Sequence, residues 1–121
     1  HSCVNAAIQY GGIAALDGPE DELHNVIEKF SLRRKLLVDG LNSLNGVECS
    51  LPGGAFYAFP NIKGTGMNGE EFANKCLHEV GVAIVPGTSF GNFATDYVRF
   101  SFAASRENIS KAIEKIDKIL K

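Results

Sequence analysis

Apolar residues recur at helical spacing along the first half of the chain. From residue 23 onward they follow one another at intervals of three, four and seven: Leu23, Ile27, Phe30, Leu37, Leu41 and Leu44. This spacing predicts an amphipathic helix of more than twenty residues that ends near Asn45-Gly46, where glycine can take the left-handed cap conformation. The polar face carries the run Arg33-Arg34-Lys35, which we interpret as solvent-exposed. Before it, residues 2–16 are loosely helical and are weakened by Gly11 and Gly12.

Strand-like stretches appear only in the second half of the chain. Residues 47–50, 55–59, 82–86 and 97–103 are rich in β-branched and aromatic side chains. In the last stretch the side chains alternate, with Val98, Phe100 and Phe102 on one face and Tyr97, Arg99 and Ser101 on the other. Two further helices are predicted, one over residues 70–79 and one that begins after the capping residue Ser105.

The predicted order is helix, helix, strand, strand, helix, strand, strand, helix. This order indicates an α+β fold, in which a small, mainly antiparallel sheet has helices packed on one face and is preceded by a long helix.

Size and charge narrow the class of protein. A chain of 121 residues is expected to form a single domain over residues 1–121. Twelve basic and fourteen acidic residues leave no basic excess to neutralise phosphates, so we expect no nucleic-acid partner. The apolar runs are far shorter than the ~20 residues needed to cross a bilayer, and the first residues lack a signal-peptide pattern. We therefore predict a cytoplasmic protein with no membrane partner.

Most candidates for site chemistry have simpler interpretations. The cysteines Cys3, Cys49 and Cys76 are widely spaced, which favours reduced, partly buried thiols over disulfides or a metal site. His24 and His78 lie on predicted helices with no nucleophile or carboxylate arranged around them. The segment 64–69 precedes a helix that opens with two glutamates, which would repel a phosphate, so we interpret it as a flexible surface connection.

Arg99 is the exception. It lies in the middle of a predicted strand, and no other charged residue occurs between Tyr97 and Ser105. A guanidinium group always carries its charge, so within a sheet it needs a carboxylate, a ligand or access to solvent. Two interpretations stay open: a structural ion pair or exposed sheet face, and a site for a substrate carboxylate, whose two oxygens match the bidentate fork of arginine.

Three strings of residues then point to a family. Residues 52–57 (PGGAFY), 81–91 (GVAIVPGTSFG) and 97–103 (YVRFSFA) closely resemble the C-terminal part of class I/II aminotransferases, the aspartate-aminotransferase-like pyridoxal-phosphate enzymes of fold type I. The first half agrees at shorter matches, which are Ser2–Asn5, Gln9-Tyr10, Ala14–Leu16, Arg33-Arg34 and Leu41-Asn42.

The resemblance implies a role for several of these positions. Arg99 matches the family arginine that binds the α-carboxylate of the amino-acid substrate. The loop from Val85 to Gly91 matches a segment beside the mouth of the active site, and Ser2–Asn5 matches a stretch near the interface of a homodimer. The long helix matches the one that passes from the large domain into the small domain, so residues 1–18 are expected to belong to the large-domain or interface side.

The lysine that forms the Schiff base with the cofactor does not match any position in this chain. The only Ser-Lys pair, Ser110-Lys111, lies in the predicted last helix, where we expect Lys111 to be solvated. The chain is thus expected to be a C-terminal fragment with no catalytic, cofactor-binding or metal-binding residue of its own. The parent enzyme is expected to use pyridoxal 5'-phosphate to transfer amino groups between amino acids and 2-oxo acids. The alternatives are another fold type I enzyme, such as a lyase or synthase, and a non-catalytic amino-acid-binding regulatory module.

Overall fold

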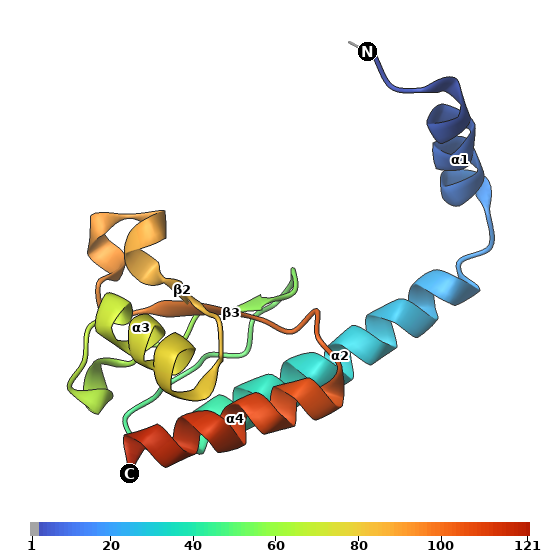
Figure 1. Cartoon of the computed structure of the whole chain (residues 1–121). Helices are drawn as coiled ribbons and strands as arrows, with labels where there is room; N and C mark the ends of the chain where they lie inside the picture. Colours follow the sequence, from blue (N-terminus) through green and yellow to red (C-terminus); the bar gives the residue numbers. More distant parts are fainter. Residues whose placement is uncertain (1–2) are drawn as a thin grey trace.

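Three short strands form an antiparallel sheet at the centre of the protein. In the computed structural model, which describes residues 3–121, the strands β1 (Tyr57–Ala58), β2 (Val85–Pro86) and β3 (Val98–Ser101) have the order β1-β3-β2. The helices are α1 (Ala6–Asp17), α2 (Asp21–Asn42), α3 (Gly69–Val80) and α4 (Arg106–Leu120), as Figure 1 shows. Short 3₁₀ helices are η1 (Lys63–Thr65), η2 (Gly87–Phe90) and η3 (Asn92–Ala94). The predicted α+β class is confirmed.

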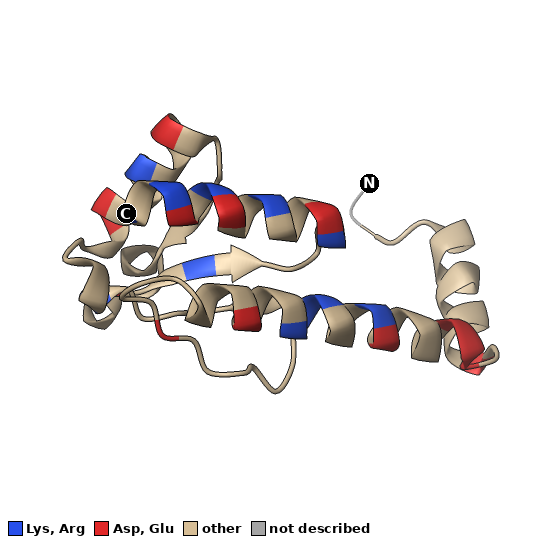
Figure 2. Cartoon of the chain, turned by 90° about the horizontal axis from the view of Figure 1, so that it is seen from below, with Lys and Arg blue, Asp and Glu red and all other residues tan. Residues whose placement is uncertain are grey.

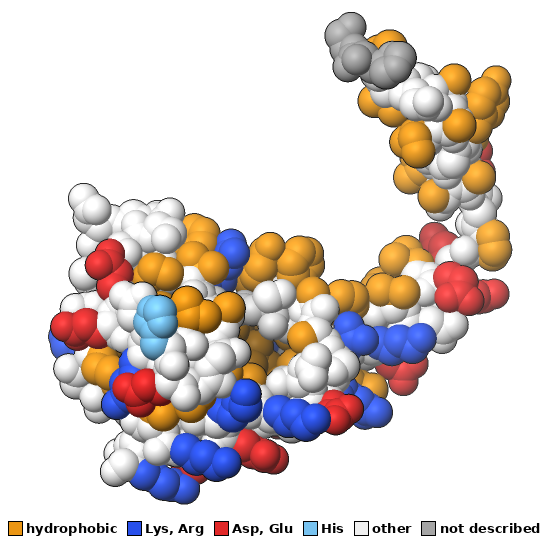
Figure 3. Space-filling model, in the orientation of Figure 1, with side chains coloured by type: hydrophobic (Ala, Val, Ile, Leu, Met, Phe, Trp, Pro, Cys, Tyr) orange, Lys and Arg blue, Asp and Glu red, His pale blue; other side chains and the backbone are white. Residues whose placement is uncertain are grey.

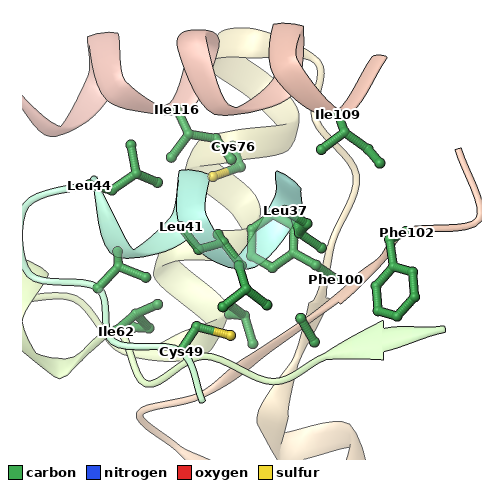
Figure 4. Packing of buried hydrophobic residues seen from close by; sticks show 14 of the residues in the cluster. Leu37, Leu41, Leu44, Cys49, Ile62, Cys76, Phe100, Phe102, Ile109 and Ile116 are labelled. Carbon is green, nitrogen blue, oxygen red and sulfur yellow. The ribbon is translucent and has the colours of Figure 1, made fainter. Parts of the chain in front are cut away.

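The hydrophobic core lies between one face of the sheet and the helices α2, α3 and α4. The alternation predicted for β3 is confirmed, because Val98 and Phe100 are buried on the helix side. Figure 4 shows Phe100 together with side chains from the helices and from the turn after α2: Leu37 and Leu41 of α2, Leu44 of the turn, Cys76 of α3, and Ile109 and Ile116 of α4. Leu41 and Ile116 are fully buried, and burying a side chain of that size contributes about 1.5–3 kcal/mol.

The N-terminal part of the chain packs on none of this core. Helix α1 has no buried residue and stands apart from the sheet in Figure 1. Its apolar side chains cover its surface in Figure 3; Ile8 is 67% exposed and Leu16 is 87% exposed. The first half of α2 is also exposed, so Leu23 and Ile27, which lie on the apolar face that the periodicity predicted, are outside the core. Ser2, the first residue of the stretch matched to an interface, lies outside the described residues.

Of the predicted strands, the stretch 47–50 is reduced to a single bridge and the stretch 55–59 to two residues, each for its own local reason. The stretch 47–50 has only an isolated bridge from Glu48 to Asn61, since the Asn42 amide bonds both the N–H and the C=O of Cys49, at 2.8 and 2.9 Å. The stretch 55–59 becomes a strand only at Tyr57, because Ala55 has a left-handed φ of 57°.

The stretch 82–86 is likewise reduced to β2. The amide of Val82 still donates to the carbonyl of Cys76 in α3, so the segment just after that helix remains bonded to its last turn.

The segment 64–69 is not the flexible surface connection that its glycines suggested. Gly64 packs on Gly46, and a Cβ at Gly64 would lie 2.7 Å from the Cα of Gly46. Gly69 is buried, and a Cβ there would lie 2.4 Å from the carbonyl oxygen of Tyr97. Asn68 caps α3, together with Glu71, in a capping box. Gly64 and Gly69 are therefore needed for close backbone contacts, and the first amides of α3 already have partners.

The interpretation of Arg33-Arg34-Lys35 as a solvated run is wrong for Arg34. Its Nη1 donates to the carbonyl of Pro52 at 3.0 Å, and its Nε is buried without a partner among the described residues. Lys35 fits the prediction, because it is exposed and pairs with Asp39 at 2.8 Å. Figure 2 shows the charged residues spread along α2 and α4, whereas α1 carries only the acidic Asp17 at its end.

Candidate functional site

Arg99 lies at the centre of the sheet face that the helices leave open. It is the second residue of the middle strand β3, and its neighbours Val98 and Phe100 point into the core. Arg99 pairs with Val85 of β2, and Tyr57 of β1 pairs with Ser101. Residues that pair directly, or two positions away along the strand, share one face, so Tyr57, Val85, Arg99 and Ser101 lie on the same side.

Two aromatic rings flank the guanidinium group of Arg99. Its Cζ lies 4.2 Å from the centroid of the Tyr57 ring and 4.8 Å from that of the Phe90 ring, both within the range of cation–π attraction. Tyr57 reaches the group from β1, and Phe90 reaches it from η2, which follows β2. Because β1 and β2 are the two neighbours of β3, the two rings approach from the two sides of the central strand.

The N–H donors of Arg99 have no acceptor within the described part of the chain. None of the side-chain hydrogen bonds or ion pairs formed within residues 3–121 involves Arg99. The structural ion pair that the sequence left open therefore has no counterpart within these residues. Arg99 is half-buried, so part of the residue remains exposed to solvent.

The other residues considered from the sequence lie away from this face or lack a suitable environment. His24 and His78 are exposed. Lys111 has a side chain that is 61% exposed and pairs with Glu107 at 2.6 Å on α4, as expected for a solvated lysine. No group of three or more His, Cys, Asp or Glu side chains within residues 3–121 is arranged to hold a metal.

The three thiols are free, and two of them are buried. Burial, with a smaller contribution from the nearby Glu79 carboxylate, raises the pKa of Cys76 to about 12. Burial also raises the pKa of Cys49. Such thiols stay protonated and unreactive at neutral pH, so both belong to the core. Cys3 is exposed, unlike the partly buried thiol that we expected.

Lys111 does not fit the lysine that would hold pyridoxal phosphate. A Schiff-base lysine must be desolvated, whereas Lys111 is exposed and ion-paired. The open face of the sheet offers one arginine, Arg99, whose N–H donors have no acceptor within residues 3–121.

Comparison with known proteins identifies the family. A family model described as aminotransferase class I and II matches residues 1–116, nearly the whole chain. The chain belongs to the class I and II aminotransferases. The family predicted from the three sequence strings is therefore confirmed.

Individual aminotransferases agree with this assignment in sequence and in fold. The chain is 39% identical over 119 residues to an aspartate aminotransferase of Pyrococcus horikoshii. The matched region covers 97% of this chain and 30% of that protein. It is 38% identical over 110 residues to an LL-diaminopimelate aminotransferase of Halothermothrix orenii. Here the matched region covers 91% of this chain and 28% of that protein.

Among solved structures, an alanine aminotransferase from Pyrococcus furiosus superposes with a TM-score of 0.91 at 34% identity, over 98% of this chain and 30% of that one. The chain thus spans less than a third of the length of these aminotransferases.

Sequence reasoning found Arg99 but missed the rings around it. Tyr57 and Phe90 are 33 positions apart, and only the strand order brings them to the same arginine. The one available signal was that both lie in strings that resemble the aminotransferases, PGGAFY and GTSFG.

Proposed function

We propose that this chain is the C-terminal domain of a pyridoxal-phosphate-dependent aminotransferase, which transfers amino groups between an amino acid and a 2-oxo acid. Support comes from the family match and from relatives that are named aminotransferases. These names also favour transamination over the lyase, synthase and regulatory-module alternatives. Because they include aspartate, LL-diaminopimelate and alanine aminotransferases, the side-chain specificity of this protein is left open.

The role of Arg99 in this proposal is to bind the α-carboxylate of the substrate. The observation that carries it is a guanidinium group with free donors, flanked by rings on the open face of the sheet. Its planar fork can form two parallel hydrogen bonds to a carboxylate. Holding the carboxylate fixes the orientation of the substrate, which is what the protein contributes when a cofactor carries the chemistry.

The exposed apolar helix α1 fits the proposed boundary of the domain. A surface that is this apolar is normally covered by a partner. We propose that residues 1–18 pack on the remaining part of the enzyme or on the second subunit of a homodimer. The described helices include none that is long and apolar enough to span a membrane. Cytoplasmic location stays a prediction from the sequence.

The cofactor and the reactive lysine are proposed to belong to residues outside this chain. Lys111, the lysine of the only Ser-Lys pair in the sequence, is solvated on α4. We therefore expect the 121-residue chain to have no aminotransferase activity on its own.

Substitution of Arg99 in the full-length enzyme tests the proposed function. Charge-assisted hydrogen bonds contribute about 1.5–3 kcal/mol each, so losing two predicts a fall in kcat/KM on the order of 10²–10⁴ for Arg99→Ala. Arg99→Lys keeps the charge and loses the fork, so its kcat/KM should lie in between. Cofactor absorbance and melting temperature should change little. Unchanged turnover with a lowered melting temperature would instead indicate a purely structural arginine.

A further inference from the structure

The rings of Tyr57 and Phe90 suggest how Arg99 is held before a substrate arrives. We propose that these two residues are positioning residues for the substrate-carboxylate site: they restrain the guanidinium group between them so that its N–H edge faces the ligand. This inference rests on the proposed function, because it assigns a task to the neighbours of the carboxylate-binding arginine.

The contacts that support it are aromatic on both sides. Tyr57 lies 4.2 Å and Phe90 lies 4.8 Å from the Cζ of Arg99, measured to the ring centroids. A ring attracts a guanidinium group through its face, whereas all five N–H donors lie in the guanidinium plane. Contacts with the ring faces therefore restrain the cation, while its N–H donors have no acceptor within residues 3–121 and stay available for a carboxylate.

Each of the two rings is itself supported by a further ring. Tyr57 contacts Phe56 at a centroid distance of 4.4 Å, and Phe90 contacts Phe59 edge-on at 5.8 Å. Phe59 in turn stacks on Tyr97 at 5.3 Å, with the two planes only 9° apart. These ring contacts connect residues in and next to β1, η2 and β3. They restrict the movement of the two rings that contact Arg99.

Without the rings, Arg99 would have to be ordered when the substrate binds. Immobilising a long side chain weakens binding by about 3- to 10-fold. The rings contact the arginine and not the reacting atoms, so they should affect the ground state and the transition state alike. Their loss should raise KM and leave kcat almost unchanged, which is the signature of uniform binding.

The test is a set of leucine variants in the full-length holoenzyme. Substrates are aspartate, alanine and LL-diaminopimelate, and the one turned over fastest is used for the kinetics. Tyr57→Leu and Phe90→Leu are each expected to raise KM about 3- to 10-fold with kcat within about twofold. Tyr57→Phe and Phe90→Tyr keep the ring and should restore KM to within about twofold. Phe93→Leu is the matched control, because Phe93 lies near the same loop and is 84% exposed.

The same leucine substitutions are then made in Arg99→Ala. If the rings act through Arg99, they should lower kcat/KM by less than about twofold there. The inference is overturned if KM is unchanged in the wild-type background, or if the loss is equally large without Arg99. The proposed role of Arg99 as the carboxylate-binding residue is overturned by a different result, an Arg99→Ala enzyme with unchanged kcat/KM. Phe90 is partly exposed, so its leucine variant should fold even if Tyr57→Leu does not.

Discussion

Gly40 lies where α2 packs against α4, and replacing it with alanine tests that contact. A Cβ at this position would lie 2.8 Å from Cγ1 of Ile113 and 3.3 Å from both Cδ1 and Cγ2. Cγ1 is close to the backbone of a β-branched side chain, so it cannot simply swing aside. Gly40→Ala therefore inserts a methyl group into a filled space.

Two opposing effects set the size of the change. Alanine is favoured over glycine in a helix interior by about 1 kcal/mol, whereas overpacking a filled contact costs about 1–3 kcal/mol. We expect Gly40→Ala to lower the free energy of unfolding by about 1 kcal/mol. When Ile113 is replaced by alanine the clash is absent, so adding Gly40→Ala to Ile113→Ala should raise the free energy of unfolding by about 1 kcal/mol.

The assay is urea unfolding of the chain, followed by circular dichroism, for the wild type, both single variants and the double variant. The expected coupling between the two substitutions is about 2 kcal/mol. If Gly40→Ala had the same effect with and without Ile113, the packing of α2 on α4 described here would be wrong.

Four further outcomes are expected. The folded state holds the Cys76 proton up to a pKa of about 12, against an ordinary value of 9.0, so the free energy of unfolding should fall between these pH values and fall less in Cys76→Ala. Thiol reagents should modify Cys3 in the native chain but Cys49 and Cys76 only after unfolding. The chain should self-associate through α1 in analytical ultracentrifugation, and Ile8→Ser with Leu16→Ser should make it monomeric; a monomeric wild type would contradict this. Borohydride reduction of the chain with pyridoxal phosphate should yield no stoichiometric adduct at a single lysine, and finding one would overturn the proposal that the reactive lysine lies outside the chain.

Hydrophobic periodicity was sufficient to predict which side of a single strand or helix faces the core. The alternation in β3 placed Val98 and Phe100 in the core and Arg99 on the open face, and the structure agrees. The same was true of α4, where Ile109 and Ile116 are buried. These patterns work because side-chain direction follows from local backbone geometry.

The features that the sequence did not predict depend on contacts between residues that are distant along the chain. The Asn42 side chain replaces a strand partner for Cys49, and Arg34 is drawn in by the carbonyl of Pro52; nothing local signals either contact. The apolar face of α2 was predicted correctly, but periodicity does not say what covers it, and Leu23 lies exposed. Tyr57 reaches Arg99 only because of the strand order.

Substrate discrimination in the full-length enzyme tests the assignment of Arg99 most directly. The measurement is the ratio of kcat/KM for an amino acid to that for the corresponding amine, which lacks the carboxylate, in the wild type and in Arg99→Ala. If Arg99 binds the carboxylate, the wild type should discriminate strongly, and the ratio should fall by a factor on the order of 10²–10⁴ in the variant. An Arg99→Ala enzyme that still prefers the amino acid by the wild-type ratio would contradict the assignment.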